Sequence, residues 1–132
     1  MNELFEHSHC VRPEEIDALG RASNVAFLEW MLAAAVGHSA ALGWPAEAYL
    51  ARGAGWVVRS HAIDYQRPAF EGDRIVVQTW VATLDGASSI RRYKIVRGET
   101  GEVLATAETR WAFVDFRTDV GRCLRHPSPR VA

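Results

Sequence analysis

An aspartate stands just ahead of the longest apolar stretch of the sequence. Asp17 is followed by Gly20, and Ser23 and Asn24 then open a run of apolar and small residues. A carboxylate in this position commonly forms a turn, because aspartate accepts hydrogen bonds from nearby backbone N–H groups. It can also act on a bound ligand, either as a nucleophile or as a general base for water. The residues by themselves leave both roles open.

The apolar run predicts one long helix directly after this aspartate. Almost every residue from Asn24 to Leu42 is apolar or small, several alanines favour the helix, and Gly43 followed by Trp44-Pro45 ends it. Ser23 has the residue type of an N-cap. The run has no polar face, and a helix that is apolar all round is normally buried on all sides. We therefore expect other elements to wrap it.

The wrapping elements are predicted to be strands. Segments rich in Val, Ile, Thr, Trp and Tyr are separated by short turn signals that contain Gly and Asp, and such short connections force antiparallel neighbours. An earlier segment, Leu4 to Arg12, adds a strand before the helix. The fold class is therefore α+β, with one long helix against an antiparallel sheet. The later strands are expected at Trp56 to Arg67, Arg74 to Leu84, Ser89 to Arg97 and Val103 to Phe116.

Composition excludes several classes of protein. The 132 residues fit a single domain, 1–132, with a surface tail at about 125–132. Fifteen Lys and Arg balance sixteen Asp and Glu, so no basic field is present to attract nucleic acid. The longest apolar run, Trp30 to Val36, is too short to span a membrane, and the first ten residues do not resemble a signal peptide. We expect a cytoplasmic protein whose two cysteines, Cys10 and Cys123, are packing residues.

Three further motifs do not predict a site. His7, His9 and Cys10 have metal-ligating side chains, but a strand would point Cys10 away from the two histidines, so we expect no metal. The GHSAA segment from Gly37 falls within the predicted helix, whereas a serine-hydrolase elbow requires a strand before the serine. The GAG segment from Gly53 lacks the third glycine of a dinucleotide site. We expect no cofactor.

The segment around Asp17 resembles a known signature. DALGRASNVAFLEW is similar to D-x-x-G-H-V-N-N-x-x-Y-L-x-W of the hot-dog-fold acyl-CoA thioesterases of the 4-hydroxybenzoyl-CoA thioesterase type. IDYQRPAFEGD, from Ile63, resembles the Y-x-R-P-x-x-x-G-D segment of that family, and FVDFRTDVGRCLRHP resembles its final strand and tail. The matching positions of the first motif are Asp17, Gly20, Asn24, Leu28 and Trp30, with Phe27 in place of the aromatic.

This resemblance implies a fold, an assembly and an activity. The fold is an antiparallel sheet of five or six strands wrapped around one long central helix. The assembly is a homodimer or homotetramer with the active site at the subunit interface. The substrate is a thioester of CoA or of an acyl carrier protein, which is hydrolysed to a carboxylic acid without a cofactor. The alternative is a hot-dog protein that binds such a thioester without hydrolysing it. A dehydratase is a weaker reading, since its histidine would have to be His38, far along the helix.

The resemblance also implies roles for individual residues. Asp17 is the nucleophile or the general base, and the backbone N–H of Asn24 stabilises the oxyanion. Hydrolysis of a thioester places negative charge on the carbonyl oxygen, and the unpaired N–H groups at a helix start are suited to receive it.

Four residues are expected to bind the substrate, and one of them, Arg21, departs from the family signature. Arg21 stands where the family has histidine, and it either holds a carboxylate or phosphate of the ligand or pairs with Glu14 or Glu15. Trp56 is expected to line an acyl pocket if it is not simply a core residue. Ser89 and Arg91 are expected to contact CoA, and Arg92 to point the other way, because neighbouring strand residues face opposite sides.

Overall fold

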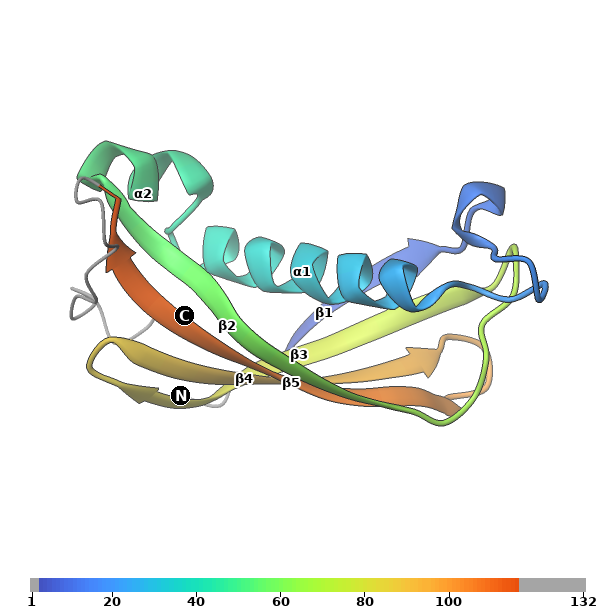
Figure 1. The fold of residues 1–132 in the computed structure, drawn as a ribbon. Coiled ribbons are helices and arrows are strands. Elements are labelled where there is room, and N and C mark those ends of the chain that lie inside the picture. Colours follow the sequence, from blue (N-terminus) through green and yellow to red (C-terminus); the bar gives the residue numbers. More distant parts are fainter. Residues whose placement is uncertain (1–2, 117–132) are drawn as a thin grey trace.

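The computed structural model describes residues 3–116, so the predicted surface tail and Cys123 lie outside the described residues. In chain order, the long helix α1, Asn24–Ala41, comes after the first strand and before the remaining four (Figure 1). A short 3-10 helix, Pro13–Glu15, follows the first strand, and a second helix, α2, Ala46–Arg52, follows α1. The strands are β1 Phe5–Cys10, β2 Ala54–Tyr65, β3 Arg74–Asp85, β4 Ser88–Arg97 and β5 Val103–Asp115.

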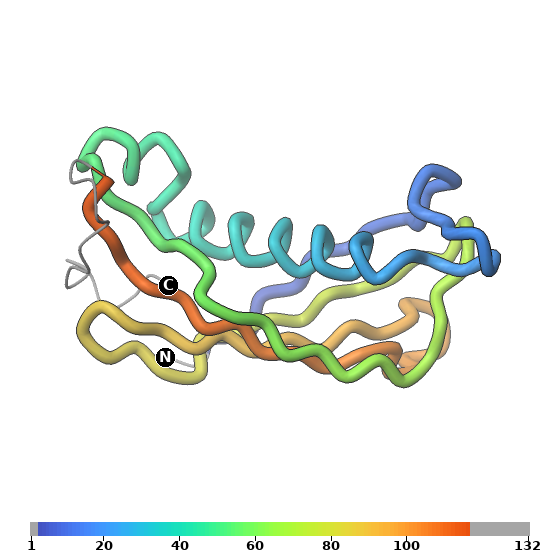
Figure 2. Tube along the Cα trace, in the orientation of Figure 1, coloured from blue at the N-terminus to red at the C-terminus, as the bar shows by residue number. Residues whose placement is uncertain are grey.

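The strands form one antiparallel sheet with the order β1-β3-β4-β5-β2. The sheet curves, and α1 lies along its concave side (Figures 1 and 2). All five predicted strands and the long helix are confirmed, with ends that differ by up to two residues. The sheet order leaves β2 at one edge, so its outer side carries no partner strand within residues 3–116.

The predicted N-cap of α1 is confirmed. The Ser23 side chain accepts a hydrogen bond from the backbone N–H of Ala26 at 3.1 Å. We expect Ser23→Ala to lower the free energy of unfolding by about 1 kcal/mol, because the Ala26 N–H then loses its acceptor. Urea unfolding of the two proteins measures this difference, and Ser88→Ala, an exposed serine at the start of β4, is the control. Equal stability of wild type and Ser23→Ala would contradict the expectation.

One side of α1 packs against the sheet. Phe27, Trp30, Met31 and Ala34 are at most 2% exposed and join residues of the three central strands in the hydrophobic core. The opposite side is uncovered in the single chain, where Val25 is 60% and Val36 is 59% exposed. The expectation that this helix is buried on all sides is therefore wrong for one chain, because the sheet wraps only one side of it. An exposed apolar helix face remains.

The second helix was not predicted from the sequence. α2 begins after Pro45 and ends at Gly53, whose φ of 70° lies in the left-handed region that glycine adopts most readily. Its Tyr49 packs against Phe113 of β5, with ring centroids 6.0 Å apart. Among residues 3–116 no single helix is long and apolar enough to cross a membrane; α1 and α2 reach that length and composition only together, across a bend of 73°.

Candidate active site

The loop that carries Asp17 is held in a tight hairpin before α1. Ile16 and Ala22 form an antiparallel bridge, and the backbone N–H of Asp17 donates to the carbonyl of Arg21 at 2.8 Å. Gly20, with φ of 85°, donates its N–H to the Asp17 carbonyl at 3.0 Å. Any other residue type would be strained at that φ. The loop therefore fixes where Asp17 stands relative to the helix start.

The Asp17 side chain is exposed and partly engaged by its own loop. Its Oδ1 accepts hydrogen bonds from the N–H of Leu19 at 2.9 Å and of Arg21 at 3.4 Å. The turn-forming role of this aspartate is thus present in the structure. Its second oxygen, Oδ2, accepts no hydrogen bond from residues 3–116, so one carboxylate oxygen is available for chemistry.

The start of α1 provides unpaired N–H groups beside this loop. Ser23 accepts the N–H of Ala26 through its side chain and that of Phe27 through its carbonyl. Within the described part of the chain, no group accepts from the N–H of Asn24 or Val25, as expected for the first residues of a helix. The N–H of Asn24, together with the positive end of the helix dipole, can therefore receive a negatively charged oxygen.

A groove of about 190 Å³ lies at this helix start. Arg21, Asn24 and Phe27 line one part of it, and the segment from Tyr65 to Pro68 lines the other. Asp17 does not line the groove. Its backbone N–H, however, donates to the carbonyl of Arg21, and Arg21 lines the groove. Two of the predicted site residues, Arg21 and Asn24, thus line one groove, next to the loop that carries the third, Asp17.

The other predicted binding residues lie elsewhere. Ser89 and Arg91 on β4 are 1% and 0% exposed, and the Ser89 hydroxyl donates to the carbonyl of Thr83 at 3.1 Å. The expectation that they contact CoA at the surface disagrees with this burial, because a nucleotide running over the surface does not reach them. The expectation for Arg92 is confirmed: it is exposed and its Nε donates to Glu108 at 3.2 Å.

Arg91 belongs to a buried polar cluster under the C-terminal half of α1. Its Nη1 donates to Nδ1 of His38 at 2.9 Å and to the hydroxyl of Thr79 at 3.1 Å. Burial lowers the pKa of Arg91, and burial together with the nearby guanidinium lowers the pKa of His38. Because a guanidinium can only donate, Nδ1 of His38 is the acceptor and the neutral ring carries its proton on Nε2. His38 therefore has a structural partner far from the loop of Asp17.

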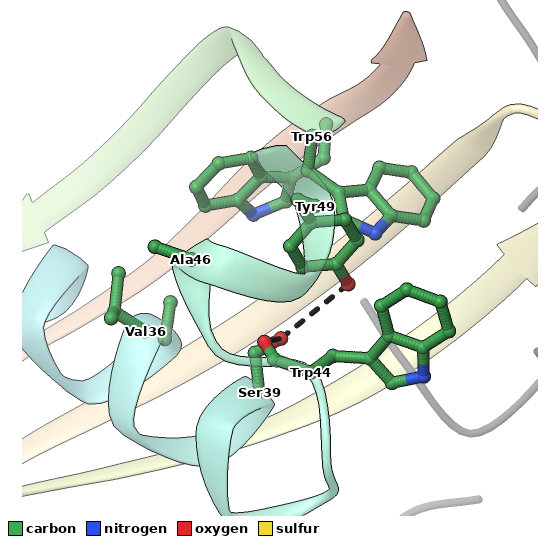
Figure 3. A pocket seen from close by; sticks show the side chains of 8 residues that line it. Val36, Ser39, Trp44, Ala46, Tyr49 and Trp56 are labelled. Atoms are coloured by element: carbon green, nitrogen blue, oxygen red, sulfur yellow. Dashed lines mark hydrogen bonds between the residues drawn. The ribbon is translucent and has the colours of Figure 1, made fainter. Parts of the chain in front are cut away.

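A second cavity, of about 150 Å³, lies between the end of α1 and α2 (Figure 3). It is mostly apolar, and its polar groups include the Ser39 hydroxyl, which lies 2.9 Å from the Trp44 carbonyl and 3.5 Å from the Tyr49 hydroxyl. Trp56 lines this cavity and not the groove at the helix start. The lining residues are Ala35, Val36, Ser39, Trp44, Ala46, Tyr49, Trp56 and Trp111.

The sequence reading missed a buried carboxylate next to the candidate site. Glu15 is 6% exposed and accepts hydrogen bonds from His9 Nε2 at 2.9 Å, the Arg12 backbone N–H at 2.9 Å and Trp30 Nε1 at 3.1 Å. Burial by itself would raise its pKa, but these donors and the Arg12 guanidinium outweigh it and lower the pKa to about 2. Glu15 therefore ties β1 and the loop of Asp17 to α1. No sequence pattern indicated this carboxylate: Glu15 accepts the N–H of Arg12 three residues earlier, but an arginine side chain cannot provide the reciprocal acceptor of a capping box.

The fold and the candidate site define a hot-dog protein with a carboxylate loop at the start of its central helix. The sequence model of the thioesterase-like superfamily matches residues 11–130, so the chain belongs to the thioesterase-like superfamily. None of the curated proteins compared with the chain matches it.

Solved structures share the whole fold. The 1,4-dihydroxy-2-naphthoyl-CoA thioesterase Slr0204 from Synechocystis has a TM-score of 0.88 and 20% identity, over 96% of this chain and 92% of that one. The DHNA-CoA thioesterase from Staphylococcus aureus has a TM-score of 0.85 and 21% identity, over 92% and 80% of the two chains. The gentisyl-coenzyme A thioesterase BH1999 has a TM-score of 0.83 and 18% identity, over 96% and 98%. At these identities the likeness establishes the hot-dog fold.

Proposed function

We propose that this protein hydrolyses an acyl-CoA thioester to a carboxylic acid and CoA. The proposal rests on two neighbouring features: an exposed carboxylate held in a fixed loop directly before α1, and the N–H of Asn24 at the start of α1, for which residues 3–116 provide no acceptor. Membership of the thioesterase-like superfamily supports the reaction class. The CoA thioesters named for all three similar structures support CoA as the carrier, with an acyl carrier protein as the alternative.

The proposed chemistry needs only residues of this chain and water. The carboxylate of Asp17 either attacks the thioester carbonyl, releasing CoA thiolate and leaving an anhydride that water then hydrolyses, or takes a proton from a water molecule that attacks the carbonyl directly. In both routes the carbonyl oxygen becomes negative and accepts the N–H of Asn24. Such a donor typically lowers the barrier by roughly 3 to 4 kcal/mol.

Arg21 is proposed to hold a negatively charged part of the substrate. It is exposed and lines the groove, whereas Glu15, one of its two alternative partners, is buried and paired with Arg12. Since CoA carries phosphates and guanidinium groups bind phosphate well, Arg21 is suited to a CoA phosphate or to a carboxylate on the acyl group.

The test of the function is the release of thiol from a panel of acyl-CoAs. We expect the wild-type protein to release CoA thiol from at least one short, long, branched or aromatic acyl-CoA. Tight thioester binding without any release would instead favour the non-hydrolytic hot-dog protein. The observation in favour of that alternative is the Asp17 carboxylate, one of whose oxygens already serves the turn.

We further propose that the protein works as a homodimer or higher homo-oligomer. Two surfaces of residues 3–116 support this: the outer edge of β2, which has no partner strand among those residues, and the apolar face of α1 with Val25 and Val36 exposed. A second copy added across β2 would extend the sheet and bring the two α1 helices together, which covers apolar surface and satisfies the strand edge.

A charge on that helix face should weaken the assembly. We expect Val36→Glu to shift the protein from dimer toward monomer, because the dimer would bury the new carboxylate in an apolar interface. Light scattering on a sizing column measures the mass. Leu50→Glu, at a position 70% exposed on α2, is the matched control and should leave the mass unchanged. A monomeric wild type would contradict the proposed assembly.

A further inference from the structure

The buried carboxylate of Glu15 is held by donors from three parts of the chain. Its oxygens accept hydrogen bonds from His9 on β1 at 2.9 Å and from Trp30 on α1 at 3.1 Å. Arg12, in the segment between β1 and the 3-10 helix, donates its backbone N–H at 2.9 Å and its guanidinium at 3.2 Å. Glu15 is 6% exposed, so these donors replace water around its charge. The chemistry described so far does not use this carboxylate.

The backbone of Glu15 is tied to the start of α1. Its carbonyl accepts the N–H of Ser23, the N-cap of α1, at 2.9 Å. The next residue, Ile16, forms the bridge to Ala22 that closes the loop of Asp17. The 3-10 helix that ends with Glu15 lies beside this end of α1 (Figure 1). Glu15 therefore stands where the loop of Asp17 leaves the body of the protein.

The backbone and the side chain of Glu15 reach two different points on α1. Ser23 is at the helix start, whereas Trp30 is seven residues further on, about 10 Å along the helix axis. A segment attached to a helix at one point can pivot about that point. Attachment at two separated points prevents the pivot, so the side chain of Glu15 fixes the orientation of the loop that its backbone anchors.

We propose that Glu15 is a positioning residue for thioester hydrolysis, and that it holds the carboxylate of Asp17 in a fixed position relative to the N–H of Asn24. The inference rests on the proposed function and adds a residue to it. Within residues 3–116 the Asp17 side chain accepts hydrogen bonds from its own loop, so the position of the loop determines where the carboxylate stands. A shift of a reacting group by about 1 Å can lower a rate roughly 100-fold.

The first experiment removes the charge of Glu15 and measures rate and binding separately. Glu15→Gln keeps the shape of the side chain but weakens its hydrogen bonds to the surrounding donors. We expect kcat for the best acyl-CoA substrate to fall roughly 10- to 100-fold with KM nearly unchanged, because the residues that line the groove are retained. Thermal unfolding verifies that each protein is folded at the assay temperature. Wild-type kcat in folded Glu15→Gln, or a change in KM alone, would overturn the proposal.

A matched control separates positioning from a general loss of stability. Ile95 is fully buried in the same core and makes none of these hydrogen bonds. Ile95→Ala leaves a cavity and is expected to lower stability about as much as Glu15→Gln does. Folded Ile95→Ala should nevertheless retain the wild-type kcat. An equal fall in kcat in both variants would show that lost stability, and not the position of the loop, is the cause.

A second variant removes the link to α1 and keeps the charge of Glu15. Trp30→Phe deletes the Nε1 donor but leaves an aromatic ring in the core. We expect a several-fold lower kcat at unchanged KM, and little further loss when Trp30→Phe is added to Glu15→Gln, because the two changes affect one hydrogen bond. Effects that multiply in the double variant would contradict the proposed link. If Glu15→Gln does not fold, Trp30→Phe decides the question, and an unchanged kcat would overturn the proposal.

Hydrogen exchange separates this proposal from the proposed function. If the wild type releases thiol from no acyl-CoA, the proposed function is wrong, and the loop is then examined without substrate. We expect amide exchange in residues 16–24 to be faster in Glu15→Gln than in Ile95→Ala, because the loop opens locally, whereas a core cavity accelerates exchange throughout the protein. Faster exchange confined to residues 16–24 would support Glu15 as the residue that holds the loop. Equal exchange of this segment in the two variants would overturn that role.

Discussion

Asp17→Asn is expected to fold like the wild type and to lose acyl-CoA hydrolysis by roughly 10² to 10⁴-fold in kcat. The amide has the shape of the carboxylate, and its oxygen can still accept the N–H of Leu19, so the turn is retained. It cannot act as a nucleophile, and it is not a base near neutral pH. Thiol release at saturating substrate measures kcat, and thermal unfolding verifies the fold.

The matched control for this variant is Asp85→Asn, which alters an exposed aspartate at the end of β3. It should leave kcat unchanged. Near-normal turnover by folded Asp17→Asn would refute the assignment of this residue. A single turnover in isotopically labelled water then distinguishes the two routes in the wild type, because only the nucleophile route transfers the label to Asp17 itself.

Glu15→Gln is expected to lower the free energy of unfolding by roughly 3 kcal/mol at pH 7. The pKa of Glu15 is about 2 in the folded chain, below its ordinary value, because His9, Trp30 and Arg12 donate hydrogen bonds to the charged form. The neutral amide accepts these hydrogen bonds more weakly. Its NH₂ group is also a donor and would face the donors of His9, Trp30 or Arg12. Urea unfolding measures the change, and Glu14→Gln, at the exposed neighbouring position, is the control.

The effect of Glu15 should depend on pH in a definite direction. A carboxylate with a lowered pKa contributes stability that is fully present above the unfolded-state value, about 4.3, and lost as the pH falls through the folded value. The difference between wild type and Glu15→Gln should therefore be largest above pH 5 and shrink to roughly half at pH 3. A difference that stays constant from pH 7 to pH 3 would show that the charge of Glu15 is not its source.

Local patterns in the sequence determined the five strands, the long helix α1 and one end of the candidate site, but not the short helix α2. Segments rich in β-branched and aromatic residues, with turn residues between them, predicted the later strands, and the alanine-rich run after Ser23 predicted α1 and its cap. These features depend on residues close together in the chain, whose preferences act before any tertiary contact forms. The spacing of Asp17 and Asn24 is also a local feature, since Asp17 stands in the turn directly before α1 and Asn24 is the first residue of α1.

Only the tertiary structure decided which side chains are enclosed and what they meet. Strand alternation placed Arg91 and Arg92 on opposite faces, but Arg91 is the buried one because His38 and Thr79, 53 and 12 residues away, accept its hydrogen bonds. Glu15 is likewise held by Trp30, and the aromatic cavity joins α1, α2, β2 and β5. A charged or polar residue is normally read as exposed, and its burial is decided by partners that the fold brings from distant parts of the chain.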